Sequence, residues 1–251
     1  MSAASPGIRS RDGFAFQARV GLSLAAAIML AWLATHICGV FLQPWTAAGL
    51  LAAPFLVALQ SWLNVGLFIV AHDCMHGSLA PFRPGLNRWV GRIALFLYAG
   101  FSFDGLIGRH FAHHRHAGTA LDPDFSEDHP DRFWPWYAAF MREYFSWREF
   151  AILTVVGAIY LTVLDAELVN VLAFWALPAI LSSLQLFYFG TYLPHRRGEE
   201  PFPDDHQARS NALSWLVSLL TCFHFGYHHE HHAKPQVPWW QLPEARRAAT
   251  R

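Results

Sequence analysis

The chain alternates long runs without charge with shorter polar segments. Residues 20–72 contain no Asp, Glu, Lys or Arg, and the polar, proline-containing segment 43–46 divides this run into two parts. Each part is long enough for the roughly 20 apolar residues that a helix needs to cross hydrocarbon. The pattern therefore predicts a transmembrane hairpin whose second helix ends at His72.

A second hairpin is predicted later in the chain. Residues 150–164 and 168–193 are free of charge, and the turn between them carries only Asp165 and Glu167 as charged residues. Residues 93–103 are also apolar but are too short to span, so they predict a re-entrant or interfacial helix. The fold class expected is an all-α membrane protein with four transmembrane helices plus interfacial helices.

The rest of the chain fits one integral-membrane domain over residues 1–251, with an N-terminal tail at 1–19 and a C-terminal tail at 244–251. Residues 118–147 are acidic, tryptophan-rich and broken by proline, which is typical of loops and surface helices at a membrane interface. The chain is 54% hydrophobic and only 14% charged, which is too apolar for an average soluble protein.

Charge and cysteine content exclude other classes. The formal net charge of +0 argues against a nucleic-acid partner, because binding phosphates requires a concentrated basic face. The three cysteines, Cys38, Cys74 and Cys222, form no Cys-x-x-Cys pair and no even framework. Neither a disulfide scaffold nor a thiolate cluster is therefore indicated.

The positions of the basic residues predict the orientation in the membrane. All 18 Lys and Arg lie in the N-terminal tail, between residues 73 and 149, or after His195, and the two short turns on the other side carry none. Loops that remain in the cytoplasm are enriched in Lys and Arg. We therefore expect a multi-pass protein of the cell (inner) membrane with both termini and the histidine clusters on the cytoplasmic side.

Three clusters of histidine have the i, i+3 or i+4 spacing that places side chains on one face of a helix. The clusters are His72 and His76; His110, His113 and His114; and His228, His231 and His232. Core packing does not require so many imidazoles, and histidine storage tracts are usually contiguous. We expect the three faces to bind metal, with His195 as a further candidate. A lone histidine in an apolar run, His36, is expected to be a hydrogen-bonded core residue.

The number of candidate ligands narrows the choice of metal site. Imidazole suits zinc, copper, nickel and iron, so histidine alone does not select the metal. Nine candidates are too many for one ion, since a mononuclear zinc hydrolase uses three protein ligands. Two irons, each with four or five imidazoles, fit better. Such a site can reduce dioxygen and attack an unactivated C–H bond, and a position just under the bilayer suggests a lipid-soluble substrate.

The histidine boxes resemble those of the membrane fatty-acid desaturase and hydroxylase superfamily, which has four transmembrane helices and a cytosolic di-iron centre. Longer strings resemble bacterial β-carotene ketolases over residues 60–243. These strings are AHDCMHGS from Ala71, HHRHAGTALDPDF from His113, FGTYLPHR from Phe189, SLLTCFHFGYHHEHH from Ser218 and PWWQLP from Pro238.

The resemblance implies an oxygenase that uses two iron ions and O2 to convert the C4 methylene of a carotenoid β-ionone ring into a ketone. Two successive hydroxylations and a dehydration would take β-carotene to echinenone and canthaxanthin. The carotenoid would come from the lipid membrane, and a ferredoxin-like protein would donate electrons.

The same resemblance implies a set of site residues. The metal ligands would be His72, His76, His110, His113, His114, His195, His228, His231 and His232. Asp122 and Asp124 would assist catalysis as carboxylates that orient imidazole N–H groups. His116, His224 and His229 stay open as replacements for a neighbour in the ligand set.

Other functions remain possible at this point. Box spacing alone does not exclude a carotenoid 3-hydroxylase or a fatty-acid desaturase, and only the strings between the boxes favour the ketolases. A histidine-rich metal transporter is a different class, and it would place its ligands near mid-membrane along a path. Asp73 and Glu230 are further carboxylates that can orient imidazoles.

A rigid polyene needs an apolar path from lipid to the metal. We expect aromatic and aliphatic side chains on the short apolar run and on the last long helix to line the end of that path, holding the ring by shape and dispersion. They are Leu97, Tyr98, Phe101, Phe103, Leu186, Phe187, Phe189 and Tyr192.

Overall fold

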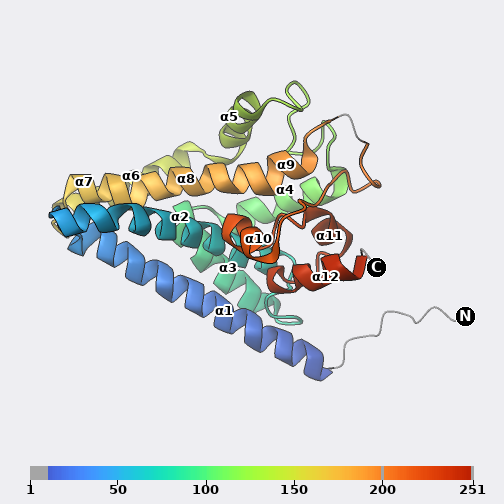
Figure 1. Ribbon diagram of the computed structural model, residues 1–251, viewed down its shortest axis with the longest axis horizontal. Helices are drawn as coiled ribbons and strands as arrows, with labels where there is room; N and C mark the ends of the chain where they lie inside the picture. Colours follow the sequence, from blue (N-terminus) through green and yellow to red (C-terminus); the bar gives the residue numbers. More distant parts are fainter. Residues whose placement is uncertain (1–10, 199–200, 250–251) are drawn as a thin grey trace, which may run out of the picture.

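The computed structural model describes residues 11–198 and 201–249, and within them every regular element is a helix. Three helices are long enough to span a membrane and run along the long axis of the molecule, and most of the shorter helices lie toward one end (Figure 1). The all-α architecture expected from the charge-free runs is therefore confirmed.

The first hairpin consists of two long apolar helices. Helix α1 (Arg11–Ile37) continues through a π-helical turn, η1 (Cys38–Leu42), and α2 (Ala47–Met75) returns against it. The Thr46 side chain accepts a hydrogen bond from the Gly49 backbone N–H at 3.2 Å and so begins α2. Helix α1 starts within the expected N-terminal tail, and residues 1–10 lie outside the described residues.

The third long helix is continuous from Leu168 to His195 and has 28 residues. It comprises α7 (Leu168–Val171), η2 (Leu172–Ala176), α8 (Leu177–Leu186), η3 (Phe187–Tyr192) and α9 (Leu193–His195). It packs on α2 through α8. His195 therefore ends a membrane-length helix, as His72 nearly does on α2.

The helix expected to be the third span is shorter than the other three. Helix α6 (Trp147–Thr162) has 16 residues, because a Ser146–Glu149 capping box begins it and Asp165, with φ 53°, follows its end. At 1.5 Å per residue it is about 24 Å long, less than the hydrocarbon thickness of about 30 Å. Among the described helices, three have the length and composition of a membrane span.

The apolar run at 93–103 lies in a bent pair of helices. Helices α3 (Pro84–Ala99) and α4 (Phe103–His116) meet at 98°, the shape of a broken span or a re-entrant segment, and count as a fourth crossing if taken together. Gly100 ends α3 with φ 71°, and a Cβ there would lie 2.8 Å from Ile152 Cγ2. The Ser102 hydroxyl then accepts from Gly105 N–H and begins α4.

The remaining helices lie in the half of the molecule away from α7, together with α4 (Figure 1). They are α5 (Phe133–Tyr144), α10 (Trp215–Cys222), α11 (His228–Ala233), η4 (Trp239–Gln241) and α12 (Leu242–Ala249). The segment expected to be a C-terminal tail forms most of α12, because Leu242 is buried and Arg246 pairs with Glu230 at 2.9 Å. Residues 250–251 lie outside the described residues.

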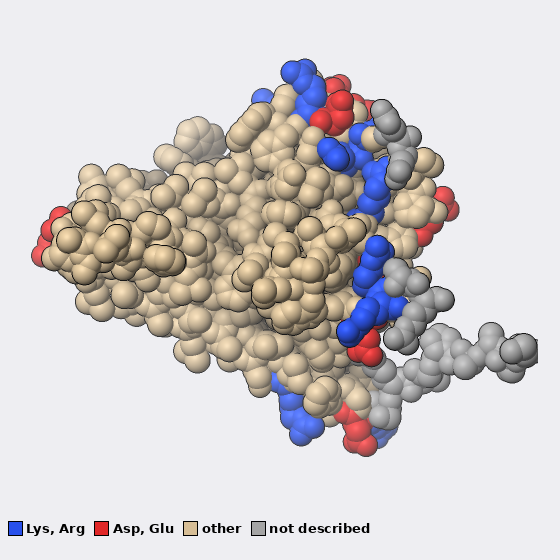
Figure 2. All heavy atoms as spheres, viewed as in Figure 1, with Lys and Arg blue, Asp and Glu red and all other residues tan. Residues whose placement is uncertain are grey.

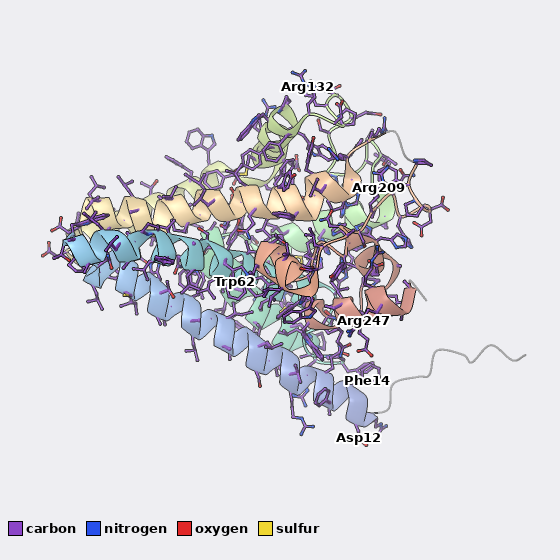
Figure 3. All side chains as sticks on the ribbon, viewed as in Figure 1. Asp12, Phe14, Trp62, Arg132, Arg209 and Arg247 are labelled. Carbon is purple, nitrogen blue, oxygen red and sulfur yellow. The ribbon has the colours of Figure 1, made fainter. Side chains whose placement is uncertain are left out.

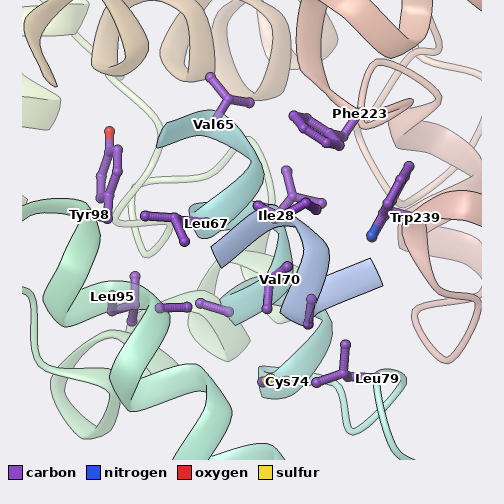
Figure 4. Packing of buried hydrophobic residues seen from close by; sticks show 14 of the residues in the cluster. Ile28, Val65, Leu67, Val70, Cys74, Leu79, Leu95, Tyr98, Phe223 and Trp239 are labelled. Atoms are coloured by element: carbon purple, nitrogen blue, oxygen red, sulfur yellow. The ribbon is translucent and has the colours of Figure 1, made fainter. Parts of the chain in front are cut away.

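The main core surrounds the second half of α2 (Figure 4). Leu67 and Val70 are fully buried there, and Phe223 closes the core from the α10 side. The Phe223 ring stacks on Trp62 at 4.4 Å between centroids and meets Trp239 edge-on at 5.2 Å. This packing fixes the end of α2 against the C-terminal helices.

The expected substrate-path residues divide between two clusters. Six of them pack in or against the main core: Leu97, Tyr98, Phe101, Phe103, Leu186 and Phe189. Phe187 and Tyr192 instead pack with Trp136 in a separate cluster beneath α5. The division follows from helix geometry, because consecutive residues of the last long helix point in different directions and therefore pack against different partners.

Basic side chains gather toward one end of the molecule. On the face shown, Lys and Arg lie at the end where the short helices gather, and the tapered end shows only acidic residues (Figure 2). Arg209 and Arg247 lie at this charged end in the side-chain view (Figure 3). The long helices between the ends show an uncharged surface suited to lipid.

Candidate metal centre

The structure brings nine histidines together in two adjacent groups. The five-histidine group is His72, His76, His110, His114 and His231, and the four-histidine group is His113, His195, His228 and His232. Within each group, one ring nitrogen from every residue lies within 4.8 Å of the others. Each group could hold one metal ion, and the members are the nine residues that the sequence singled out.

Two helices supply ligands to both groups. On α4, His113 faces one group and its neighbour His114 faces the other; on α11, His232 and His231 divide in the same way. Consecutive residues point about 100° apart around a helix, so a helix that runs between two sites can serve both. The His114 and His232 rings stack across the two groups at 4.3 Å between centroids.

The nitrogen separations fit a shared cation. In the four-histidine group, His232 Nε2 lies 3.1 Å from both His113 Nε2 and His228 Nε2. One hydrogen can bridge only one of these pairs, so three converging nitrogens leave a lone pair without a partner. Bonds from a metal to imidazole nitrogen are about 2.0–2.1 Å long, so nitrogens that shared one cation would lie about 3 Å or slightly more apart, as these do.

The five-histidine group repeats this arrangement. His110 Nε2 lies 2.6 Å from His76 Nε2, and His231 Nε2 lies 3.0 Å from His114 Nε2. His72 Nε2 is buried and has no hydrogen-bond partner. Because buried polar atoms are nearly always satisfied, such an atom among converging imidazoles points to a bound cation.

A carboxylate and a carbonyl oxygen orient two ligands of the four-histidine group. His113 Nδ1 donates to Asp122 Oδ1 at 2.9 Å, and His195 Nδ1 donates to the Gln207 carbonyl oxygen at 2.8 Å. Each bond places the proton on Nδ1 and leaves Nε2 free to bind a metal. His195 Nε2 is buried without a partner, as a ligand nitrogen would be.

Asp122 is itself held in place. Its Oδ1 accepts from Asp124 N–H and its Oδ2 from Gly118 N–H, both at 2.9 Å. Burial alone would raise the pKa of Asp122, but the hydrogen bond and charge of His113 and the two backbone N–H groups lower it below its ordinary value. Asp122 is therefore an ionised acceptor that fixes the His113 ring.

The second carboxylate expected to act here has a different setting. Asp124 Oδ2 lies 3.8 Å from His113 Nδ1, beyond a hydrogen bond, and Asp124 Oδ1 accepts from the Tyr144 hydroxyl. Burial raises the pKa of Asp124 to about 6, opposed by the His113 charge. Asp124 borders a cavity of about 280 Å³ that Asp122, Trp136 and Glu143 also line.

The histidines of α11 are held in the neutral state that binds metal. Burial, followed by the charges of neighbouring histidines, keeps the pKa of His228, His231 and His232 well below the ordinary value. Metal ligation requires an unprotonated nitrogen, so no proton has to be displaced from these rings.

A strained turn aims α11 at the metal groups. Phe223 and His224 are consecutive and both have left-handed backbone conformations, with φ 48° and 62°. This conformation is costly for residues with a Cβ, and the burial of the Phe223 ring in the core stabilises it. The turn reverses the chain between α10 and α11.

The histidines that the sequence left open lie outside both groups. His224 stacks with Trp239 and Tyr227, and His229 turns away from the centre to Asp204, with Nε2 to Oδ2 at 2.9 Å. His116 follows the last ligand on α4 and is half-buried. None of the three belongs to a metal-binding group among the described residues.

Two other carboxylates bind groups other than imidazole. Asp73 Oδ2 accepts from Trp239 N–H at 3.3 Å, and Glu230 binds Ser210 and Arg246. These contacts tie the C-terminal helices together, and other groups hydrogen-bond to the metal ligands.

Phe225 is a site residue that the sequence did not single out. Its ring centroid lies 4.5 Å from that of His72, 4.7 Å from His228 and 5.2 Å from His231, so it contacts both groups. Gly190 lies on its other side, where a Cβ would be 3.1 Å from Phe225 Cδ1. Its place in the histidine-rich string FHFGYHHEHH was the only available signal.

Comparison with known proteins identifies one family and several similar ketolases. The family model described as fatty acid desaturase matches residues 44–152 and 134–251. The chain is 52% identical over 233 residues to the beta-carotene ketolase of Paracoccus sp. (strain PC1), covering 92% of this chain and 94% of that protein. It is also 52% identical over 226 residues to the beta-carotene ketolase of Paracoccus sp. (strain N81106 / MBIC 01143), covering 90% and 91%. The zeaxanthin 4-ketolase of Chlamydomonas reinhardtii is 36% identical over 242 residues, 91% of this chain and 54% of that protein.

Proposed function

Because the chain belongs to the fatty acid desaturase family, we propose that it is an O2-dependent carotenoid ketolase of the membrane, which oxidises the C4 methylene of a β-ionone ring to a ketone. The structural observation that carries the proposal is the pair of adjacent imidazole groups at the ends of membrane-length helices. This arrangement suits a substrate that lies in the bilayer and reacts at the membrane surface.

We propose that each histidine group holds one iron ion, through the nine residues named above. Two bound irons would supply the reduction of dioxygen and the oxidation of an unactivated C–H bond, which side chains cannot perform. The chain contributes imidazoles, two of them oriented by Asp122 and the Gln207 carbonyl, and a largely dry setting, since all four members of the four-histidine group are buried.

The overall reaction determines how much dioxygen and how many electrons and protons must reach the site. Each hydroxylation consumes one dioxygen, two electrons and two protons, inserts one oxygen atom into a C–H bond and releases one water. Two hydroxylations at the same carbon give a geminal diol, which loses water to leave the ketone. We propose a ferredoxin-like protein as the electron donor, as the resemblance to the desaturase family implies.

Phe225 and Gly190 are well placed to position the substrate ring. An unsubstituted ring has no hydrogen-bonding group, so only shape and dispersion can hold it. Phe225 packs against both histidine groups, and the missing side chain at Gly190 lets the last long helix approach the Phe225 ring closely. We propose that this pair, with the core residues Tyr98 and Phe101, forms the end of the apolar path.

The placement of the ligands argues against a metal transporter. A transport path would distribute ligands along the membrane-spanning helices. His72 and His195 instead lie near the ends of their helices, at the end of the molecule where α4 and α11 gather (Figure 1). The absence of Lys and Arg from the opposite turns supports a cytoplasmic location of this end in the inner membrane.

Expression in cells that accumulate β-carotene tests the proposal. We expect echinenone and canthaxanthin to appear in the pigment extract, and the purified protein to contain two irons per chain. His195→Ala should abolish the ketones, whereas His129→Ala, which removes a half-buried histidine outside both groups, should retain them. Hydroxylated pigment without ketone, or labile zinc in place of iron, would overturn the proposal.

A further inference from the structure

The start of α1 packs against the loop of residues 76–83, which follows the first histidine pair. Gln17 Nε2 donates to the Ser78 carbonyl oxygen at 2.7 Å. The Phe14 ring meets the Phe82 ring edge-on at 4.9 Å between centroids. The 76–83 loop is therefore held beside α1 at the end of the bundle where α2 ends.

A cavity of about 400 Å³ lies between α1 and this loop, at the start of α1 where Asp12 and Phe14 are labelled in Figure 3. Its volume is within the roughly 300–1,000 Å³ of small-molecule sites. The residues that line it are Asp12, Ala15, Ala18, Arg19 and Leu22 of α1, and Arg83 of the loop. Their spacing along α1 is mostly three or four residues, so one face of the helix forms this side of the cavity.

The cavity lies at the boundary between water and hydrocarbon. Arg19 is the last charged residue before the charge-free run 20–72, and the return of α2 against α1 brings Arg83 to the same end of the hairpin. Basic pockets beside transmembrane helices at this level are typical binding sites for lipid headgroups. Phe16 and Phe82 are 53% and 83% exposed, which suits contact with lipid rather than with water.

Two cationic side chains in this cavity lack a protein partner. Among the described residues, the side chains of Arg19 and Arg83 form no ion pair or hydrogen bond. A guanidinium group binds phosphate through paired N–H donors, and two of them in one cavity favour that ligand. Asp12 adds one carboxylate to the lining, so the cavity offers two positive charges and one negative charge.

The charges are arranged in order of depth along α1. At 1.5 Å per residue, Asp12 lies about 10 Å nearer the cytoplasmic end than Arg19, and Leu22 lies about 4.5 Å deeper than Arg19. Helical side chains lean towards the N-terminus, which brings the Arg19 guanidinium closer to Asp12. The cavity thus presents an anion outermost, cations next and an apolar side chain deepest. A phospholipid with an ethanolamine headgroup has the complementary order of ammonium, phosphate and acyl chain.

We propose that this cavity binds one aminophospholipid of the phosphatidylethanolamine type. Its phosphate lies between Arg19 and Arg83, its ammonium group lies at Asp12, and an acyl chain passes Leu22 into the bilayer. The bound lipid joins α1 to the 76–83 loop and so braces the end of α2 that carries the first histidine pair. The inference rests on the membrane location of the chain and does not depend on the metal or the substrate.

Native mass spectrometry of the intact chain released from detergent tests the proposal by counting bound lipid during titration. We expect one phosphatidylethanolamine per chain to bind more tightly than phosphatidylglycerol, which has a phosphate but no amine. The double variant Arg19→Gln and Arg83→Gln should weaken this binding by about tenfold or more, because it removes two cationic contacts to phosphate. Circular dichroism checks that the variant keeps its helix content.

A matched double variant controls for the loss of charge alone. Arg132→Gln and Arg142→Gln remove two exposed positive charges at the two ends of α5, on the opposite side of the molecule from the start of α1 in Figure 1, and should bind the lipid as wild type does. Ala15→Leu keeps every charge but fills part of the cavity at an exposed position, and it should also weaken binding. Wild-type affinity in both the arginine double variant and Ala15→Leu would overturn the lipid site.

Two further measurements identify the ligand. Asp12→Asn should remove the preference for phosphatidylethanolamine over phosphatidylglycerol, and a wild-type chain that binds both lipids equally would overturn the assignment of the amine. Inorganic phosphate should not displace the lipid, since it lacks the acyl chain. Displacement by phosphate alone would show a site for free anions and overturn the lipid assignment.

The bracing role has its own measurement, hydrogen exchange of the intact chain with and without phosphatidylethanolamine. Backbone exchange in the 76–83 loop should slow when the lipid is bound, and unchanged exchange there would refute the bracing. Ketone formation is measured separately. A chain that binds the lipid yet forms no ketone would refute the proposed reaction and leave the lipid site standing, and a ketone-forming chain without selective lipid binding would do the reverse.

Discussion

The bond between Asp122 and His113 offers a sharp test of how the second metal group is held. Asp122→Asn keeps the shape of the side chain but replaces one acceptor oxygen with an NH2 donor. The carboxylate accepts from three N–H groups, those of His113, Gly118 and Asp124. If the amide oxygen stays towards His113, its NH2 faces the Gly118 N–H, donor against donor. If the amide rotates by half a turn, its NH2 faces the donating Nδ1–H of His113 instead.

The expected magnitude follows from the role of this contact. Loss of a carboxylate that orients a metal-bound histidine typically lowers metal affinity or activity by about 10–100-fold, or roughly 1.4–2.8 kcal/mol. Of the two histidine groups, Asp122 contacts only the four-histidine group, so the affinity for only one ion should fall. We expect Asp122→Asn to retain one tightly held iron and one that a competing chelator removes, with ketone formation reduced in proportion.

The assay is iron content during titration with a chelator, alongside pigment analysis from the same cells. The iron of the five-histidine group reports that the variant has folded, so a simple folding defect is distinguishable. Asp128→Asn makes the same change at an exposed carboxylate of the same loop and should behave as wild type. Two irons that resist the chelator as in wild type, with normal pigment, would refute the orienting role of Asp122.

Three further outcomes are expected. His195→Ala removes the one ligand of the four-histidine group that lies outside the histidine boxes, and purified protein should lose one iron; an unchanged count of two would remove His195 from the ligand set. Gly190→Ala places a Cβ 3.1 Å from Phe225 Cδ1, so Phe225 must shift towards the histidines. The ratio of singly to doubly oxidised pigment should then change while the iron content stays the same. An unaltered ratio would place the substrate elsewhere. Reporter fusions at Asp165 should register outside the cytoplasm and those at Gly118 inside, and a cytoplasmic signal at Asp165 would contradict the proposed orientation.

The sequence by itself determined the features that depend on local geometry. The i, i+3 and i+4 spacing is a property of a single helix, so the histidine clusters could be recognised without knowing what packs against them. The same holds for the charge-free runs, whose length alone indicates a span. His36 also follows this rule, since a lone polar group in an apolar run requires a partner, and the structure provides the Tyr160 hydroxyl at 2.9 Å.

The tertiary structure alone decided how the ligands divide. His231 and His232 are adjacent in sequence, yet they face different groups, because His231 meets His72 of α2 and His232 meets His195 of the last long helix. No spacing rule gives this, since the partners lie more than a hundred residues away: His231 meets His114 and His232 meets His113. Crossing angles and core packing set those contacts, and neither is encoded in a local pattern.

The same reason explains the features that sequence reasoning missed. Phe225 contacts both groups only because a strained turn at Phe223 reverses the chain, and that conformation depends on the buried Phe223 ring. The loop before α10 has no regular structure, yet it meets His195 through the Gln207 carbonyl and α11 through the Ser210 side chain. Local spacing thus identified the metal-binding side chains, and long-range packing decided which of them share an ion and what surrounds it.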